Sequence, residues 1–422
     1  MKSRKERLVS ALEWLVSPLA ILLTVWYVTS RLLRYTILMQ EQKGIFLWTP
    51  DYLRQTLSDP WPLTTLISDF LTQFYQNPSH GGLVTAVIVT SAYLCVSHIL
   101  RFFRFRWLSG LLASCVVWYV IAHSNTAHTG VVITVFGIAA CLVSCLFPYS
   151  KADRGGSKEW LLRLAASIIL LFGTTFILAK DRGLRDNEKW YAVEYASRCH
   201  DWKLVLGIAT IDACKADVSY VPYALLALNA TGQLGERILD YPVTGPESLG
   251  EGGEESWSNY SLRSIIYEVI GCPNEAIHMT YQYAAAMPHA TSFGALRQLI
   301  RLQTENEDFT LARKYAEILK RSPRNRKVAE NALKTIAEME AKSTGEPVSN
   351  VSTAEDRMIS NNSVYNMGAI ISNCRNSTAA AGDRLLAHLL LSGNFAELGR
   401  ALGELYDTSN PDRLPKYFRI RP

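Results

Sequence analysis

The hydrophobic pattern of the chain changes near Lys180. Before that residue, five long apolar runs carry very few charged side chains, and each has about the length that a helix needs to cross the hydrocarbon core of a bilayer. The third run is short, so a re-entrant unit over residues 107–147, which would leave four spans, is an alternative to five. The predicted membrane spans are residues 14–30, 83–100, 107–121, 130–147 and 160–178.

The loop between the first two predicted spans, residues 31–82, contains a shorter amphipathic segment. In residues 63–74 the apolar positions recur at helical spacing, opposite polar side chains such as Thr64. Trp48 and Trp61 lie nearby, and tryptophan favours the headgroup zone of a bilayer. The pattern predicts a helix along the outer membrane surface, and packing on the protein's own outer domain is the alternative.

After Lys180 the helical period continues, but polar faces appear and breakers interrupt it at short intervals. Since no convincing strand pattern competes, we predict an all-α chain. It consists of a transmembrane helix bundle over residues 1–180 and a soluble domain of helical hairpins over residues 181–422. The helices predicted in the second domain are residues 187–199, 202–213, 220–231, 233–241, 260–271, 274–287, 292–304, 309–321, 326–342, 356–372, 379–391 and 395–406.

Two of these hairpins resemble tetratricopeptide repeats. The segment LQTENEDFTLARKYAEILKRSP has a polar turn, then small residues at Ala312 and Ala316, then a proline that ends the unit. The segment VIGCPNEAIHMTYQYAAAMP is similar, with small residues at Ala276 and Ala284. A stack of such hairpins presents a concave face suited to peptides or protein segments. A compact helical domain with only two repeat-like pairs is the alternative, because the motif is degenerate.

Charge is divided in the same way as hydrophobicity. Residues 1–180 contain 16 Lys and Arg against 8 Asp and Glu, whereas residues 181–422 contain 27 against 30. Ten of the basic residues of the first part lie in the N-terminal tail and in the linkers after the second and fourth predicted spans, whereas the turn at residues 124–129 has none. The positive-inside rule therefore places the N-terminus in the cytoplasm and residues 181–422 in the periplasm of a bacterial inner membrane. Because the second part is slightly acidic, we expect no nucleic-acid partner.

Several segments together resemble a known family. They are FLWTPDYLRQTL and FLTQFYQNP in the first outer loop, LLALNATGQLGERILDYPVTGPESL, and the paired repeats that end with ARKYAEILKRSP. These segments are similar to an uncharacterised family of multi-pass inner-membrane proteins from Bacteroides-type bacteria. The resemblance implies many spans followed by a repeat-like helical domain, with no assigned activity, and this chain looks like a shortened member.

No catalytic signature of the GxSxG, HExxH or Cys-His type occurs in the chain. The enzyme alternative concerns the acids of the first outer loop, where membrane glycosyltransferases that use polyprenyl-linked sugars commonly place a catalytic carboxylate. By that analogy of fold alone, a glycan-processing or transfer enzyme, or its degenerate relative, would use Asp51, Asp59 and Asp69. A role in helix capping explains Asp51 and Asp59 without any chemistry.

The longest gap in the helical pattern is residues 242–258, which are rich in Gly and Glu. That composition favours disorder, and a functional loop here would be an acidic contact surface. We predict no metal site and no cofactor. Of the four cysteines after Lys180, Cys199 and Cys214 fall at opposite ends of a hairpin and cannot pair, while a disulfide between Cys272 and Cys374 is open.

The sequence thus favours a membrane-anchored helical-repeat scaffold of the cell envelope, with no catalysis assigned. Its expected partners are the lipid bilayer and a protein or peptide bound by the helical-repeat domain. The candidate partner-binding residues are Tyr241, Glu247, Glu251, Tyr281, Arg297 and Arg301.

Overall fold

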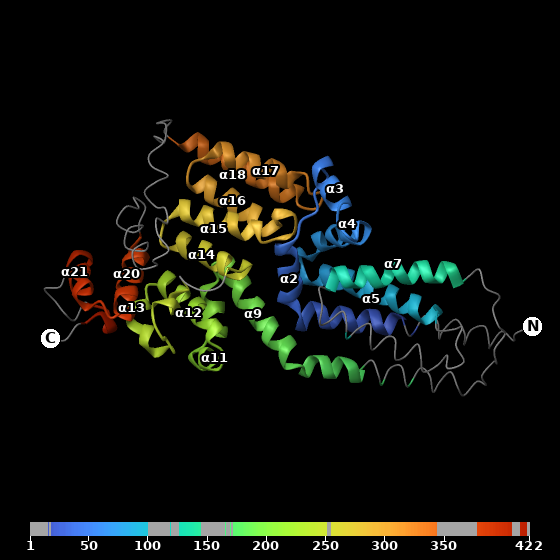
Figure 1. Cartoon of the computed structure of the whole chain (residues 1–422), viewed down its shortest axis with the longest axis horizontal. Helices are drawn as coiled ribbons and strands as arrows, with labels where there is room; N and C mark the ends of the chain where they lie inside the picture. The colour runs from blue at the N-terminus through green and yellow to red at the C-terminus, as the bar shows by residue number, and fades with distance from the viewer. Residues whose placement is uncertain are drawn as a thin grey trace, which may run out of the picture. The chain divides into compact units, whose positions relative to one another are not determined.

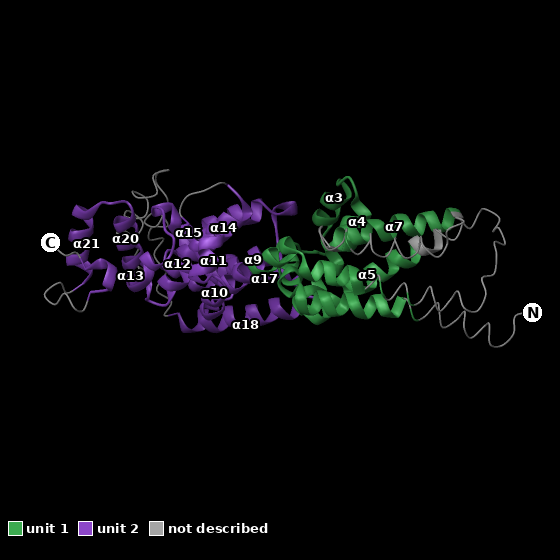
Figure 2. Cartoon of the chain, turned by 90° about the horizontal axis from the view of Figure 1, so that it is seen from below, with its two compact units in different colours: residues 1–189 green, residues 190–422 purple. Residues whose placement is uncertain are grey.

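A computed structural model of the chain describes residues 16, 18–99, 119, 126–144, 165, 169, 172–250, 255–343, 378–406 and 414–419. Within these ranges every regular element is a helix, which confirms the predicted all-α fold. The chain divides into two compact units, residues 1–189 and residues 190–422 (Figure 2). The sequence placed this division at Lys180.

Unit 1 is built from helices that pack around α5 (Pro78–Ile99). Its partner α7 (Thr126–Ser144) runs parallel to it, because Thr134 donates to the Ile88 carbonyl (3.4 Å) and Cys141 donates to the Cys95 carbonyl (3.5 Å). The other elements are η1 (Val28–Leu32), α2 (Arg34–Lys43), α3 (Pro50–Leu57), α4 (Pro62–Thr72), η2 (Gln73–Gln76) and the start of α9 (Arg182–Arg198).

Glycine allows two of these elements to approach α5 closely. A Cβ atom on Gly81 would come within 2.5 Å of the Ile37 side chain, and one on Gly82 would come within 3.0 Å of Ser30. Any larger residue would push the start of α5 away from α2 and η1. The two glycines therefore hold the first turns of α5 against the preceding chain.

The spans predicted at residues 83–100 and 130–147 coincide with α5 and α7, and both predicted ranges end just beyond the described residues. The first predicted span overlaps a described helical stretch, residues 18–32. The span predicted at residues 107–121 lies outside the described residues except for Tyr119, and the one at residues 160–178 is described only at residues 165, 169 and 172–178. In the described part of the chain, no helix is sufficiently long and apolar to cross a membrane.

The helix predicted at residues 63–74 exists, although it ends earlier than expected. It begins with a proline at Pro62, whose missing N–H costs nothing in the first turn of a helix. After Thr72 the chain tightens into the 3₁₀ turn η2. The preceding α3 is capped by Thr49, whose hydroxyl accepts from the Tyr52 amide at 3.3 Å.

Unit 2 is a succession of short antiparallel helices (Figure 1). A large apolar core lies around α12, where Leu225, Leu226 and Leu228 are fully buried. The helices after α9 are α10 (Trp202–Ile208), α11 (Ile211–Ala216), α12 (Val221–Ala230), α13 (Leu234–Arg237), α14 (Trp257–Val269), α15 (Pro273–Ala285), α16 (Phe293–Glu305), α17 (Phe309–Lys320), α18 (Arg326–Lys342), α20 (Ala379–Leu391) and α21 (Phe395–Leu405). Short 3₁₀ turns lie at Val218–Tyr220, Ile238–Asp240, Pro246–Leu249, Pro288–Ala290 and Lys416–Phe418.

Most helices of unit 2 follow the sequence prediction within a few residues. The helices predicted at residues 326–342 and 379–391 are confirmed to the residue. The helix predicted at residues 202–213 is wrong, because Thr210 ends α10 and caps α11 by accepting from the Ala213 amide at 3.3 Å. The helix predicted at residues 356–372 lies outside the described residues.

The expectation of disorder in the Gly and Glu rich gap is wrong for residues 242–250. This stretch forms the 3₁₀ turn η6 (Pro246–Leu249), and the Leu249 side chain is fully buried. The buried Arg384 guanidinium donates to the Leu249 carbonyl. The buried Leu249 side chain and the Arg384 donor fix the turn. Neither contact can be read from the Gly and Glu rich composition of this segment. Residues 251–254 lie outside the described residues.

Candidate functional site

Three helices of unit 2, α9, α14 and α16, share a line of polar side chains that we call the polar ladder. On α14 it consists of Ser261, Ser264 and Glu268, which recur at helical spacing and so lie on one face. On α16 it consists of Gln298, Arg301 and Glu305 at the same spacing. The ladder is buried at its Ser261 end and reaches solvent at its Glu305 end.

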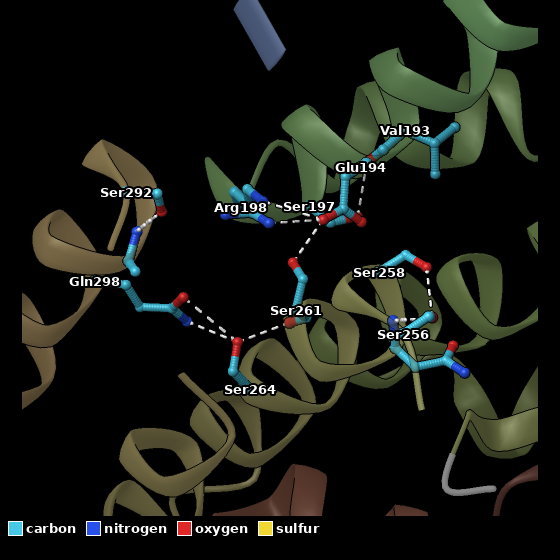
Figure 3. Close-up of polar contacts among 12 residues, drawn as sticks. Val193, Glu194, Ser197, Arg198, Ser256, Ser258, Ser261, Ser264, Ser292 and Gln298 are labelled. Atoms are coloured by element: carbon cyan, nitrogen blue, oxygen red, sulfur yellow. Dashed lines mark hydrogen bonds and ion pairs between the residues drawn. The ribbon is translucent and has the colours of Figure 1, made fainter. Parts of the chain in front are cut away.

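The buried end of the ladder is centred on Glu194 of α9, which is completely buried (Figure 3). Its carboxylate pairs with the Arg198 guanidinium at 3.0 Å, one turn further along the same helix. It also accepts hydrogen bonds of 2.5 Å from the hydroxyls of Tyr223 on α12 and Ser261 on α14. The Arg198 guanidinium lies 4.4 Å from the centre of the Tyr283 ring on α15. One ion pair therefore joins four helices.

The local electrostatics follow from this burial. Burial, followed by the nearby Glu194 charge, raises the pKa of the Tyr223 phenol well above its usual value. The phenol thus stays protonated and acts as a donor to Glu194. A buried carboxylate with three donors is a satisfied group, so Glu194 fixes the helices and offers no free acceptor to a ligand.

The middle of the ladder joins α14 to α16. Gln298 donates its amide N–H to the Ser264 hydroxyl at 3.0 Å, and the Ser264 hydroxyl in turn donates to the Ser261 carbonyl at 2.7 Å (Figure 3). Both Ser264 and Gln298 are buried. Since these two helices belong to successive hairpins, this contact fixes the register of one hairpin on the next.

The exposed end of the ladder carries charges. Arg301 donates to the Glu268 carboxylate at 2.7 Å, and the His200 ring lies 3.2 Å from the other oxygen of Glu268. The His200 ring also stacks on Trp202 with the ring centroids 5.1 Å apart. Burial, and then repulsion from Glu268, raises the pKa of the Glu305 carboxyl, although Arg301 and His200 oppose this.

This end can bind charged groups of a partner. It presents two carboxylates, one guanidinium and one imidazole on adjacent helices, and its side chains are partly solvent-exposed. His200 holds the left-handed backbone conformation (φ 56°) directly after α9, which aims its ring at Glu268 instead of continuing the helix. The arrangement suits ionic and hydrogen-bonded recognition more than group transfer.

The ladder lies within a stack of helical hairpins. α14 packs on α15, α15 on α16, α16 on α17 and α17 on α18, in yellow to orange in Figure 1. The small residues predicted from the repeat-like pattern lie at these contacts: Ala276, Ala312 and Ala316 are completely buried. Methyl side chains at these positions allow neighbouring helices to approach closely.

The predicted partner-binding residues are distributed over different surroundings. Arg297 and Tyr281 are exposed, on α16 and α15 respectively, and the Tyr281 hydroxyl contacts that of Tyr315. Arg301 is part of the exposed end of the ladder. Of the six candidates, the structure brings Arg297 and Arg301 together on one helix.

The remaining candidates do not share that surface. Tyr241 is only 4 % exposed and belongs to the core beneath Arg237, so it is not a contact residue. Burial raises the pKa of its phenol. Glu247 is exposed and accepts from the Thr244 hydroxyl at 2.9 Å within its own turn. Glu251 lies outside the described residues.

The three acids of the enzyme alternative lie on or next to α3 and α4 of unit 1, where burial, and then the charges of Asp69 and Asp59, raise the pKa of the Tyr52 phenol. Asp51 is exposed in the first turn of α3, 3.8 Å from Arg54, and Asp59 follows the end of that helix, about 12 Å away along its axis at 1.5 Å per residue. Asp69 on α4 accepts a 2.6 Å hydrogen bond from the Tyr52 hydroxyl. The first two acids are therefore at opposite ends of one helix, and the enzyme alternative stays a prediction.

Sequence reasoning missed Glu194, Glu268 and His200. The pair Glu194 and Arg198 has the i, i+4 spacing that favours an ion pair on a helix, so it could have been marked as a pair. Its burial could not have been anticipated, because the donors from α12 and α14 are 29 and 67 residues away in the chain. Glu268 and Arg301 are likewise 33 residues apart.

Among the described residues, no group of three or more His, Cys, Asp or Glu side chains is placed so that it could hold a metal ion. Cys199 and Cys214 are free thiols, and Cys214 and Cys272 are buried. Cys374, the suggested partner of Cys272, lies outside the described residues.

Comparison with known proteins adds one finding. The model of a protein family matches residues 10–180 and 160–419, and its description is a family of unknown function, DUF6057. No curated protein and no solved structure matches the chain. The match covers both units, so neither unit is an addition peculiar to this chain.

Proposed function

This chain belongs to DUF6057, a family of unknown function, and we propose that it is a membrane-anchored scaffold. In this proposal unit 1 is embedded in a bacterial inner membrane, and unit 2 binds a protein or peptide through its helical hairpins. The observation that carries the proposal is the opposite placement of polar and apolar side chains in the two units.

Unit 1 places apolar side chains outside and hydroxyl groups inside. On α7 the side chains of Phe136, Ile138 and Leu142 are exposed, Leu142 to 67 %. On α5, by contrast, Thr85 and Thr90 are buried. A helix that faces water shows the reverse pattern, whereas lipid favours an apolar surface, with buried hydroxyls bonded inside the protein. Residues 83–100 and 130–147 contain no Asp, Glu, Lys or Arg.

The parallel direction of α5 and α7 also supports a multi-pass arrangement. Two neighbouring helices that run the same way cannot be joined by a short turn. In the predicted topology these two segments are the second and fourth spans, which cross in the same direction because one span separates them. We therefore retain the proposal of an N-terminus in the cytoplasm and a periplasmic unit 2.

Unit 2 supports the binding role through its surface. Its core is apolar and its helices turn charged side chains outward, as in a domain surrounded by water. Arg301, at the exposed end of the ladder, lies one helical turn from Arg297 on α16. Repeated helical hairpins commonly provide extended binding faces of this kind. The Bacteroides-type origin stays a prediction from the resemblance.

In the experiment, the photo-crosslinker p-benzoylphenylalanine replaces Arg297 in the full chain. The variant is expressed in cells in which the chain resides in its own membrane. We expect the protein to stay in the membrane pellet after alkaline carbonate extraction, and the crosslinker at Arg297 to give a discrete adduct with another protein. The matched control carries the crosslinker at Lys203, which is exposed on α10, and we expect no such adduct there.

A charge reversal makes the test specific. Arg301→Glu places a third carboxylate beside Glu268 and Glu305, and should abolish the adduct formed at Arg297 because the partner's charges no longer match. Release of the chain by carbonate would overturn the membrane part of the proposal. An adduct that is absent, or that is equally strong from Lys203 or with Arg301→Glu, would overturn the binding part.

A further inference from the structure

The α4 helix of unit 1 is turned the opposite way from a helix on a water-exposed surface. Its buried side chains are Thr64, Ser68 and Thr72. Leu63 and Phe70 are exposed to 58 % and 42 %. The sequence correctly predicted an amphipathic helix, but the structure shows that the polar stripe faces the protein and the apolar stripe faces outward.

The buried stripe needs no water. Thr64 donates to the Trp61 carbonyl at 2.9 Å, Ser68 to the Thr65 carbonyl at 3.0 Å, and Thr72 to the Asp69 carbonyl at 2.9 Å. Each hydroxyl is thus satisfied within its own helix, as a hydroxyl in an apolar medium must be. The helix can therefore be surrounded by protein on one side and lipid on the other without an unpaired hydroxyl.

The exposed stripe of α4 is continuous with the apolar surface of α7. The Trp61 ring meets the Phe136 ring edge to face, with centroids 5.6 Å apart, and both side chains are more than half exposed. At the other end of α4, Tyr75 of η2 packs in one cluster with Ala127. α4 and η2 therefore run antiparallel to α7 and follow its first turns, beside it in Figure 1.

The contact between Trp61 and Phe136 indicates how deeply the start of α4 lies in the bilayer. Phe136 lies six residues after Gly130, where the predicted span begins, which is about 9 Å along the helix axis at 1.5 Å per residue. That distance is roughly a third of the ~30 Å hydrocarbon core. This depth places the Trp61 ring among the acyl chains of the leaflet at which α7 begins.

We propose that α4 is inserted into the leaflet at which α7 begins, with the edge formed by Trp61, Leu63 and Phe70 against lipid acyl chains. The inference rests on the proposed membrane location of unit 1. The occupant of this surface is lipid because the Trp61 and Phe136 rings join it to the exposed apolar side chains of α7, which the proposed function places against acyl chains. α3 marks the water side, since Asp51 and Arg54 on it are 94 % and 83 % exposed.

The test uses the full chain reconstituted in vesicles of phosphatidylcholine and phosphatidylglycerol. p-Benzoylphenylalanine, which reacts with C–H bonds, replaces Leu63 or Phe70 in separate variants, and adducts are identified by mass spectrometry of peptides. Leu142 on α7 serves as the position that tests the membrane location itself, and Gln55, exposed on α3, serves as the water-side control. Phe70 is aromatic, so its variant preserves a ring if the Leu63 variant fails to fold.

We expect lipid adducts at Leu63, Phe70 and Leu142, and none at Gln55. Lipid adducts at Leu142 without any at Leu63 or Phe70 would overturn this inference and leave the proposed function standing. Adducts between two copies of the chain at Leu63 and Phe70 would also overturn it, in favour of a dimer contact. A lack of lipid adducts at Leu142 would instead refute the membrane location and this inference with it.

Discussion

Glu188 shows how a single carboxylate completes a helix that its own sequence leaves uncapped. The residue before α2, Leu33, has no side chain that can accept from the first turn. Glu188 from α9 accepts from the amides of Tyr35 (2.6 Å) and Thr36 (2.9 Å), and from the Thr36 hydroxyl (2.7 Å). A negative charge at a helix N-terminus is favourable. Burial nevertheless prevails over these three hydrogen bonds and raises the pKa of the Glu188 carboxyl.

This shift predicts a pH dependence of unit 1. Because the pKa in the folded chain lies above the usual 4.5, protonation of Glu188 favours folding. Its contribution is complete at low pH and is lost as the pH rises through the raised pKa. Glu188→Gln imitates the protonated acid, so the Tm of the wild type minus that of the variant should be larger at about pH 4 than at about pH 7.

Thermal unfolding of the purified chain at both pH values measures this difference. Asp186→Asn is the matched control, because Asp186 is exposed on the same helix and pairs only loosely with Lys189 at 3.8 Å. Its effect on Tm should not depend on pH in the same way. A difference for Glu188→Gln that grows toward neutral pH would show that the amides stabilise the charged carboxylate more than burial opposes it.

At the scale of elements, the packing of α9, α12 and α14 depends on one buried ion pair. Glu194 is completely buried and the Arg198 side chain is 9 % exposed. Such a pair contributes little by itself relative to apolar packing, but removal of one partner leaves an uncompensated charge. The hydroxyls of Tyr223 and Ser261 would lose their acceptor at the same time.

Glu194→Gln should therefore destabilise unit 2 by about 3 to 5 kcal/mol, the usual cost of breaking a buried pair. Hydrogen exchange of peptides from α12 and α14 reports on this unit separately. Glu397→Gln is the control, since Glu397 pairs with Arg400 at the surface, and its removal should cost less than about 1 kcal/mol. Adding Arg198→Met to Glu194→Gln should restore part of the loss, and a double variant no more stable than the single one would contradict this account.

The elements of unit 2 could be predicted because their ends have local causes. Asp308 caps α17 by accepting from the Leu311 amide at 3.0 Å, and Pro273 begins α15. Both signals can be read from the sequence. The break of α10 at Thr210 could not, because a threonine in a helical pattern becomes a cap only when the chain turns there. The turn around Leu249 was missed because its anchor, Arg384, is 135 residues away.

At the scale of the whole molecule, the two units distribute polar groups in opposite ways, and the change of pattern near Lys180 predicted this. Among the residues at the exposed end of the ladder, the sequence identified Arg301 as a candidate for partner binding. It could not identify Glu268 or His200. These residues become neighbours only when successive hairpins stack. For α4 the sequence left both directions open, since a helix along the membrane surface turns its apolar stripe outward and one packed on the protein's own domain turns it inward.

The topology predicts which parts of the chain a membrane-impermeant maleimide can reach. In a background that carries Cys199→Ser and Cys374→Ser, Arg297→Cys should be labelled in intact cells, because the proposed topology places unit 2 in the periplasm. Ser3→Cys should be labelled only after the inner membrane is permeabilised. The opposite pattern would place unit 2 in the cytoplasm, as the alternative with four spans requires.

The hydrogen bonds between Glu188 and residues 35 and 36 join parts of the chain that are 153 and 152 residues apart. During synthesis α2 thus emerges long before its cap does, by roughly 10 to 30 s at bacterial translation rates of 5–20 residues per second. Until then the helix has an open N-terminus. The segment around α2 is consequently among the last parts of unit 1 to settle, and a chaperone or protease that samples nascent chains would meet it while the N-terminus of α2 is still open.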